Sequence, residues 1–109
     1  MTNVDSKKLQ ILYIAYFGRP GDPSGINYWL SRSKELFTIK EISNELSRQD
    51  EYTKFRALDK SLECKINNVY LNLFNRKVDF DGLNYWVEMA DNKEYKISDI
   101  ICELSLIHI

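Results

Sequence analysis

The sequence predicts an all-α protein of about six helices, arranged as two copies of a helix-loop-helix-helix unit. One stretch occurs twice, at residues 13–30 (YIAYFGRPGDPSGINYWL) and at residues 70–87 (YLNLFNRKVDFDGLNYWV), with a constant spacing of 57 residues. Matched aromatic, glycine and charged positions at one constant spacing indicate an internal structural repeat. Apolar residues recur at helical spacing in both copies, and no window shows the alternation that is typical of a β-strand.

The first helix of each copy is predicted from an apolar stripe with the spacing i, i+3, i+4, i+7, i+8. Each stripe ends at a residue that tolerates the left-handed conformation closing many helices, Gly18 in the first copy and Asn75 in the second. The two stripes consist of Leu9, Leu12, Tyr13, Tyr16 and Phe17, and of Ile66, Val69, Tyr70, Leu73 and Phe74.

The second helix of each copy has the same predicted start. Asp22 and Asp79 are good N-cap residues because a short carboxylate accepts hydrogen bonds from the first backbone N–H groups. Gly25 and Gly82 follow near the third helical position, where glycine costs about 1 kcal/mol relative to alanine. We therefore expect another backbone or an aromatic ring to pack closely at these two glycines.

The apolar stripe continues through the second helix to a tryptophan in each copy, so Trp29 and Trp86 are expected in the core. A third helix follows, and its spacing between copies is 58 residues because the preceding loop has gained one residue. The stripes of the third helices consist of Ile39, Ile42 and Leu46, and of Ile97, Ile100 and Leu104.

The chain divides into a polar, frayed N-terminus and one domain made of two copies, with the boundaries 1–8, 9–65 and 66–109. The first copy continues through residues 50–58, which we expect to form a short helical turn. The second copy has no equivalent of this turn, and its apolar residues 106–109 stand opposite polar positions of the first copy. We therefore expect the second copy to be truncated and the chain to be part of a larger multidomain protein.

The charge of the chain excludes some classes of partner. The formal net charge is −1, and no basic run exceeds the pair Lys7–Lys8. Nucleic acid is not an expected partner, because phosphate backbones are bound by a positive field. No apolar run is long enough to span a bilayer, so no transmembrane segment is predicted. The first ten residues lack the apolar region of a secretory signal peptide.

The residue types needed for catalysis or metal binding do not form a recognisable pattern. His108 is the only histidine, and Cys64 and Cys102 are isolated, so the four ligands of a zinc site are not present. We expect both cysteines to be small buried thiols, and their spacing does not establish a disulfide. A Cys–His nucleophilic pair would need His108 at the end of the chain. In an EF-hand frame over residues 77–88, Lys77 stands where a carboxylate is required. The sequence therefore predicts no catalytic residue, metal or cofactor.

Arginine and aspartate occupy the turn between the first two helices in both copies, as Arg19 with Asp22 and Arg76 with Asp79. One interpretation is structural: the guanidinium group spans the turn and bonds the cap carboxylate or the last helical carbonyls. The other is functional: the guanidinium group receives a carboxylate or the hydroxyl groups of a sugar. These four residues are candidate ligand-binding residues.

An asparagine–tyrosine pair lies beside the core stripe in both copies, as Asn27–Tyr28 and Asn84–Tyr85. An exposed polar-aromatic pair presented twice is suited to contact a carbohydrate or a protein. Alternatively, the asparagine bonds the neighbouring loop and the tyrosine packs on a flanking helix. These four residues complete the set of candidate binding residues.

The doubled stretch resembles the signature of the bacterial domain-of-unknown-function family 4214. The first copy carries the whole signature, in Gly18, Arg19, Asp22, Gly25, Tyr28 and Trp29. The second copy keeps Arg76, Asp79, Gly82, Tyr85 and Trp86, with Asn75 in place of the first glycine. The resemblance extends from about Leu9 to Leu104.

This resemblance implies an all-helical, often tandem module found in large secreted or cell-surface proteins of bacteria, such as surface-layer-like and adhesin-like proteins. It implies a non-catalytic module that binds a surface glycan or another protein, and an extracellular or cell-surface location. Two alternatives remain: a structural spacer whose repeats stack on neighbouring repeats, and an accessory domain beside a glycan-processing enzyme. The resemblance supplies no ligand.

Overall fold

The described parts of this chain are mainly helical, as the apolar stripes at helical spacing predict. In this computed structural model, those parts are residues 4–33, 38–49, 51–56 and 61–108, with only the backbone described at 54–56, 107 and 108. The described residues include no strand, which confirms the predicted all-α class. The segments are α1 (Ser6–Phe17), α2 (Pro23–Ser33), α3 (Ile39–Ser47), the π-helical η1 (Glu51–Arg56), α4 (Leu62–Phe74), α5 (Phe80–Asn92) and α6 (Ile97–His108).

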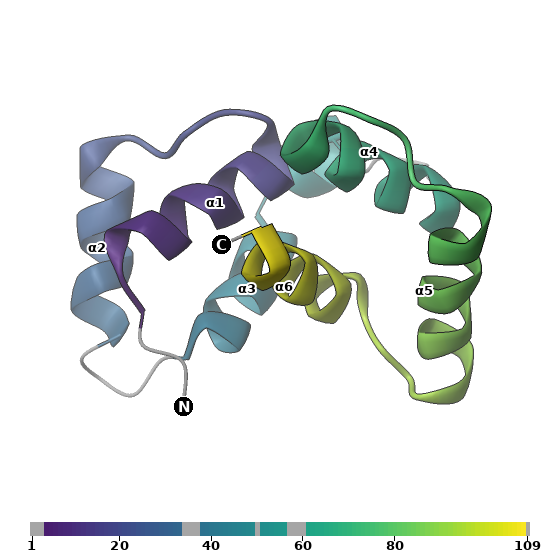
Figure 1. Ribbon diagram of the computed structural model, residues 1–109. Helices are drawn as coiled ribbons and strands as arrows, with labels where there is room; N and C mark the ends of the chain where they lie inside the picture. The colour runs from purple at the N-terminus through teal and green to yellow at the C-terminus, as the bar shows by residue number, and fades with distance from the viewer. Residues whose placement is uncertain (1–3, 34–37, 50, 57–60, 109) are drawn as a thin grey trace.

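The two copies lie side by side, with α1 and α4 forming one layer and α3 and α6 packing together beneath it (Figure 1). The helices α2 and α5 stand at opposite sides of the molecule (Figure 1). The helices α1 and α6 are central: α1 contacts α2, α3, η1, α4 and α6, and α6 contacts α1, α3 and α4. The radius of gyration, 13.4 Å, agrees with that of one compact domain of this length.

The copies meet at equivalent positions of the repeat. Asn72 Nδ2 donates a hydrogen bond of 3.0 Å to the carbonyl of Ala15, a residue 57 positions earlier. Below, the side chain of Ser43 in α3 donates to the carbonyl of Ser98 in α6 at 2.8 Å. A residue that touches its own counterpart is expected where two similar units meet across an approximate two-fold axis.

One core joins all six α-helices. Trp29 and Trp86 are each only 4% exposed, which confirms their predicted place in the core. Tyr16 is fully buried in this core, and its hydroxyl donates to the carbonyl of Ser43 at 2.7 Å. The core consists of Leu9, Ile11, Leu12, Tyr13, Ala15, Tyr16, Phe17, Ile26, Trp29, Ile39, Ile42, Leu46, Tyr52, Ile66, Val69, Leu73, Trp86, Ile100, Ile101, Cys102 and Leu104.

The first helix begins earlier than the apolar stripe indicates. Asp5 is the N-cap of α1 and accepts a hydrogen bond from the backbone N–H of Lys8 at 2.8 Å. Residues 6–8, which the sequence assigns to a frayed terminus, are therefore helical, and Val4 packs against the core. The stripe marks where burial begins, whereas the cap marks where the helix begins.

The third helices start in the same way and end differently. Thr38 and Glu41 form a capping box at the start of α3. At the start of α6, Asp99 accepts the backbone N–H of Lys96 at 2.9 Å, which is half of the same arrangement. The helix α6 then runs for 12 residues against 9 in α3. In the first copy the chain instead leaves α3 and forms η1, as the expected helical turn.

Candidate functional site

The turn between the first two helices is built alike in both copies. Gly18 and Asn75 adopt the left-handed conformation, at φ 70° and 57°, and close α1 and α4 as predicted. Asp22 then accepts the backbone N–H of Gly25 at 2.8 Å, and Asp79 accepts that of Gly82 at 2.7 Å. Both aspartates are thus the predicted N-caps, and their carboxylates are used in fixing the turn.

A tyrosine–tryptophan hydrogen bond locks each turn onto its first helix. The indole N–H of Trp29 donates to the hydroxyl of Tyr13 at 3.1 Å, and that of Trp86 donates to Tyr70 at 3.1 Å. The tyrosine also explains the glycine at the third helical position. A Cβ atom on Gly25 would lie 2.9 Å from the Tyr13 hydroxyl, which confirms the expected close approach of a ring.

An amide side chain on the first helix also holds the turn, and sequence reasoning missed it. The side chain of Gln10 accepts from the backbone N–H of Gly21 at 2.8 Å and donates to its carbonyl at 3.2 Å. In the second copy, Asn67 accepts from the backbone N–H of Val78 at 3.1 Å. Gln10 and Asn67 are 57 residues apart, so the repeat spacing marks them as a matched amide pair.

The candidate residues Tyr28 and Tyr85 are presented to solvent in the same way. Their side chains are 53% and 52% exposed. Each ring stands edge-on to the tryptophan that follows it, with centroids 4.8 Å apart and an interplanar angle of 77° in both copies. Asn27 and Asn84 are exposed beside them, and within the described part of the chain their side chains form no hydrogen bond. The alternative in which each asparagine bonds a loop is therefore not observed.

The copies differ in the charged groups around these tyrosines, and one of these groups contacts the ring. The guanidinium carbon of Arg32 lies 5.6 Å from the centroid of the Tyr28 ring, a distance typical of a cation–π contact. The equivalent position in the second copy is Met89. The surface around Tyr28 therefore carries a cation that the surface around Tyr85 does not have at this position.

The candidate arginines Arg19 and Arg76 have different surroundings. Arg19 donates to both carboxylate oxygens of Glu51 in η1, at 3.1 and 2.5 Å, and to the carbonyl of Pro20 at 3.1 Å. The interpretation in which Arg19 bonds the cap carboxylate of Asp22 is not observed, because the guanidinium group is directed to Glu51 and to the Pro20 carbonyl. Arg76 is exposed and makes no hydrogen bond or ion pair among the described residues.

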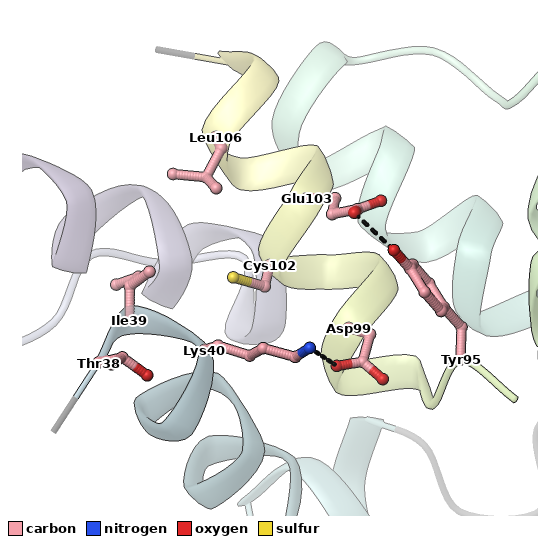
Figure 2. A pocket seen from close by; sticks show the side chains of 8 residues that line it. All are labelled: Thr38, Ile39, Lys40, Tyr95, Asp99, Cys102, Glu103 and Leu106. Carbon is pink, nitrogen blue, oxygen red and sulfur yellow. Dashed lines mark hydrogen bonds and ion pairs between the residues drawn. The ribbon is translucent and has the colours of Figure 1, made fainter. Parts of the chain in front are cut away.

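A pocket of about 350 Å³ lies between α3 and α6 (Figure 2). Lys40 pairs with Asp99 at 3.5 Å across it, and the Tyr95 hydroxyl bonds Glu103 at 2.8 Å at its edge. These polar groups are already paired with one another. The pairs contribute to the contact between the two helices and leave few polar groups for a ligand. Sequence reasoning did not indicate this pocket, since its two sides come from different copies.

Cys102 lies in this pocket and is a poor nucleophile. Burial raises the pKa of the Cys102 thiol to about 11, so the thiol is protonated at neutral pH. Cys64 is exposed on α4, so the expectation of a buried thiol is wrong for Cys64 and confirmed for Cys102. Neither cysteine is in a disulfide. The side chain of His108, the proposed base of a Cys–His pair, lies outside the described residues.

In comparisons with known proteins, no family model matches this chain, and no curated protein or solved structure matches it either. The resemblance to family 4214 is thus neither supported nor contradicted, and it stays a prediction.

The described part of the chain contains neither a cluster of metal-binding residues nor a membrane-spanning helix. No group of three or more His, Cys, Asp or Glu residues lies close enough together there to hold a metal ion. None of the helices there is long and apolar enough to cross a membrane. The surfaces that remain as candidates are the two exposed tyrosines with their asparagines.

Proposed function

We propose that this chain is a non-catalytic attachment module of a bacterial surface protein, and that each copy binds a sugar of a surface glycan. Tyr28 and Tyr85 are the binding residues, with Asn27 and Asn84 beside them. One observation carries the proposal: the same half-exposed ring, held against a buried tryptophan at the same distance and angle, is built twice.

The chemistry of this surface suits a carbohydrate. The apolar face of a sugar ring packs on an aromatic ring, and an amide side chain can both donate to and accept from the hydroxyl groups around it. Trp29 fixes the orientation of Tyr28, and Trp86 that of Tyr85, so little side-chain entropy is lost on binding. The asparagine amides have no partner within the described chain, so they can bond sugar hydroxyl groups without breaking another bond.

The placement of the two surfaces favours a polymeric ligand. Helices α2 and α5, which carry the two tyrosines, stand at opposite sides of the molecule (Figure 1). One small sugar cannot contact both surfaces, whereas a repeating polysaccharide can occupy them together. Two weak sites joined by a rigid core then give a stronger total attachment, because the second binding event is intramolecular.

The resemblance to family 4214 supports a place at the cell surface, where such a glycan would be met. The accessory role beside a glycan-processing enzyme would use the same two surfaces. The spacer role would use neither of them, so glycan binding separates it from the proposed function.

The proposal is tested by titrating the chain with bacterial cell-wall polysaccharides and with an array of short glycans. We expect Tyr28→Ala and Tyr85→Ala each to weaken binding to the polymer, and the double variant to lose it, with helicity unchanged by circular dichroism. Phe80→Ala is the matched control, because Phe80 is a 76% exposed aromatic residue that occurs in one copy alone. Loss of binding in this control would indicate that exposed aromatic residues bind the glycan nonspecifically.

Two results would contradict the proposal. Binding that survives in the double variant would place the glycan elsewhere. No binding of any glycan at millimolar concentration, together with self-association that depends on protein concentration, would favour the structural spacer.

A further inference from the structure

The two copies differ in what lies over the end of the first helix. In the first copy η1 packs against α1 and α3. Its Glu51 forms the double hydrogen bond with Arg19, and its Tyr52 is buried edge-on against Tyr16, with ring centroids 4.9 Å apart. In the second copy, no segment of the described chain follows α6 in this way.

A groove of about 680 Å³ lies at the corresponding place in the second copy, between α4, α5 and α6. Its lining includes Tyr70, Phe74, Arg76, Trp86, Leu104 and Leu106. Three of these, Tyr70, Phe74 and Arg76, are the counterparts of Tyr13, Phe17 and Arg19 in the first copy. Arg19 is the residue of this set that bonds η1, through Glu51, so Arg76 marks the matching place in the second copy. Tyr52 packs on Tyr16, whose counterpart Leu73 is buried beside the groove and does not line it.

The aromatic side chains near the end of the first helix are more buried in the first copy, where η1 packs on this helix. Phe17 is 1% exposed and Tyr13 is 7% exposed, whereas Phe74 and Tyr70 are only partly buried. Arg76 is exposed and has no carboxylate partner among the described residues, although its counterpart Arg19 has one. Leu106 also replaces the polar Arg48 of the first copy, so the groove of the second copy is more apolar.

We propose that this groove is a docking site for a helical turn of a partner polypeptide that carries a carboxylate followed by an aromatic residue. The first copy provides the precedent, because Glu51 bonds Arg19 there while the adjacent Tyr52 is buried on the same side of the helix end, against Tyr16. The partner's carboxylate pairs with the guanidinium group of Arg76, for which two parallel hydrogen bonds are the favoured geometry. Its aromatic ring enters the apolar part formed by Leu104 and Leu106. The groove is mostly apolar, Arg76 is the cation in its lining, and the one carboxylate there, Glu103, already accepts from the Tyr95 hydroxyl at 2.8 Å. This lining fits a carboxylate followed by an aromatic ring.

This inference does not rest on the proposed glycan binding, although Tyr85 lies at the edge of the groove. The test therefore uses Arg76 and Leu106, which lie away from the Asn84–Tyr85 pair in sequence. Lys77 is the matched control, because it is an exposed cation adjacent to Arg76 that does not line the groove.

The probe is a capped synthetic peptide with the sequence of residues 49–56, titrated into the full chain while backbone amide signals are followed by NMR. We expect shifts at residues lining the groove of the second copy, with a dissociation constant that reaches the millimolar range for so short a segment. Arg76→Glu is expected to weaken binding about 10-fold through like-charge repulsion, whereas Lys77→Ala leaves it unchanged. Leu106→Ala should weaken binding without removing its dependence on salt.

A charge exchange makes the test specific. A peptide in which the glutamate is replaced by lysine should bind poorly to the wild type and recover binding to the Arg76→Glu variant. A peptide in which the tyrosine is replaced by alanine should bind poorly to both. Recovery in the exchanged pair can arise only if these two charges meet.

Three outcomes would overturn the inference. These are no shift at about 5 mM peptide, shifts confined to the first copy, or equal binding by wild type and Arg76→Glu. Self-association through this groove without peptide, seen by analytical ultracentrifugation and abolished by Arg76→Glu, would assign the groove to a second copy of the chain. Failure of the glycan proposal can be distinguished from failure of this one. Tyr28→Ala should leave peptide binding unchanged, and Arg76→Glu should leave glycan binding at Tyr28 unchanged.

Discussion

The end of α1 in the first copy and the end of α4 in the second are equivalent in sequence and different in their surroundings. Phe17 is buried where η1 packs against α1, while its counterpart Phe74 is only partly buried beside a groove. Arg19 is paired with Glu51, while Arg76 has no such partner among the residues described. The turns that follow these helices nevertheless have the same caps and the same tyrosine–tryptophan bond.

The helix ends are held by two kinds of interaction, local contacts within the turn and contacts with a segment outside the repeat. The turn is specified by contacts within about twenty residues, so each copy builds it without help from the other. The surface over the first helix depends on a segment that lies outside the repeated stretch. The following substitutions compare equivalent positions of the two copies, because equal effects indicate shared local structure and unequal effects measure what η1 contributes.

The largest effect is expected at the tryptophans, where the copies should agree. Trp29→Ala and Trp86→Ala should each lower the free energy of unfolding by about 3–5 kcal/mol, because both rings are buried and each removal leaves a cavity. The measurement is urea denaturation followed by circular dichroism. A loss below about 1 kcal/mol for either variant would show that its ring lies on a surface and would end the equivalence of the two turns.

The next effect is a loss of stability at alkaline pH that arises in the first copy. Burial raises the pKa of Tyr52 from 10 to about 12, and Tyr52 has no counterpart in the second copy. The folded state therefore holds this proton more tightly than the unfolded state does. The stabilisation is complete below pH 10 and is lost as the pH rises through 12, by an amount of order 2 kcal/mol.

The control for this pH dependence is Tyr52→Phe, which keeps the ring and removes the titrating hydroxyl. We expect its stability at pH 7 to stay near that of the wild type and its decline between pH 10 and 12 to be smaller. Some decline should remain, because burial also raises the pKa of Tyr16 and of Tyr13. Identical pH profiles for the two proteins would show that the Tyr52 side chain of η1 is not buried in the core.

The glycines at the start of the second helices should respond unequally to alanine. In the first copy the new Cβ atom would lie 2.9 Å from the Tyr13 hydroxyl, which Trp29 holds in place. In the second copy the corresponding distance to the Tyr70 hydroxyl is 3.5 Å. Gly25→Ala should therefore destabilise by about 1–2 kcal/mol, because the strain exceeds the gain in helix propensity.

Gly82→Ala should be nearly neutral, with a change below about 0.5 kcal/mol. The new Cβ atom would lie 3.0 Å from Asp79 Oδ1 and 3.1 Å from Val78 Cγ2, and the gain in helix propensity offsets the small shifts that these two side chains must make. Thermal unfolding of the two variants side by side measures the difference. Equal losses at both glycines would mean that the two tyrosines approach equally closely.

The smallest effect is expected at the arginines. Arg19→Ala should cost about 0.5–1 kcal/mol, because it removes an exposed but doubly bonded ion pair with Glu51. Arg76→Ala should cost nothing measurable in the isolated chain. Raising the salt concentration should reduce the effect of Arg19→Ala and leave that of Arg76→Ala unchanged. A larger loss for Arg76→Ala than for Arg19→Ala would reverse the comparison.

The sequence was sufficient to predict the features that depend on local spacing. Asp22 and Asp79 are caps because a short carboxylate precedes the free backbone N–H groups of a first helical turn, and this requirement can be read along the chain. The helical stripes and the buried tryptophans follow from periodicity in the same way. The family resemblance and the binding role are not tested by these features.

The features that sequence reasoning missed depend on which segments meet in space. Arg19 bonds Glu51, which is 32 positions away, because η1 folds back over α1, and nothing in the turn itself indicates that return. Cys64 is exposed although cysteine is usually buried, because it lies on the outer face of α4. The hydrogen bond between Tyr13 and Trp29 depends on the angle between α1 and α2. An apolar stripe in the sequence does not indicate that angle.

The central position of α6 has a consequence for how the chain folds. Its contacts with α1, α3 and α4 mean that a helix of the second copy completes the core of both copies. Neither copy can bury its apolar stripe before that helix is available, so the repeat does not behave as a stack of independent units. Folding is therefore cooperative over the described helices and waits for the end of the second copy.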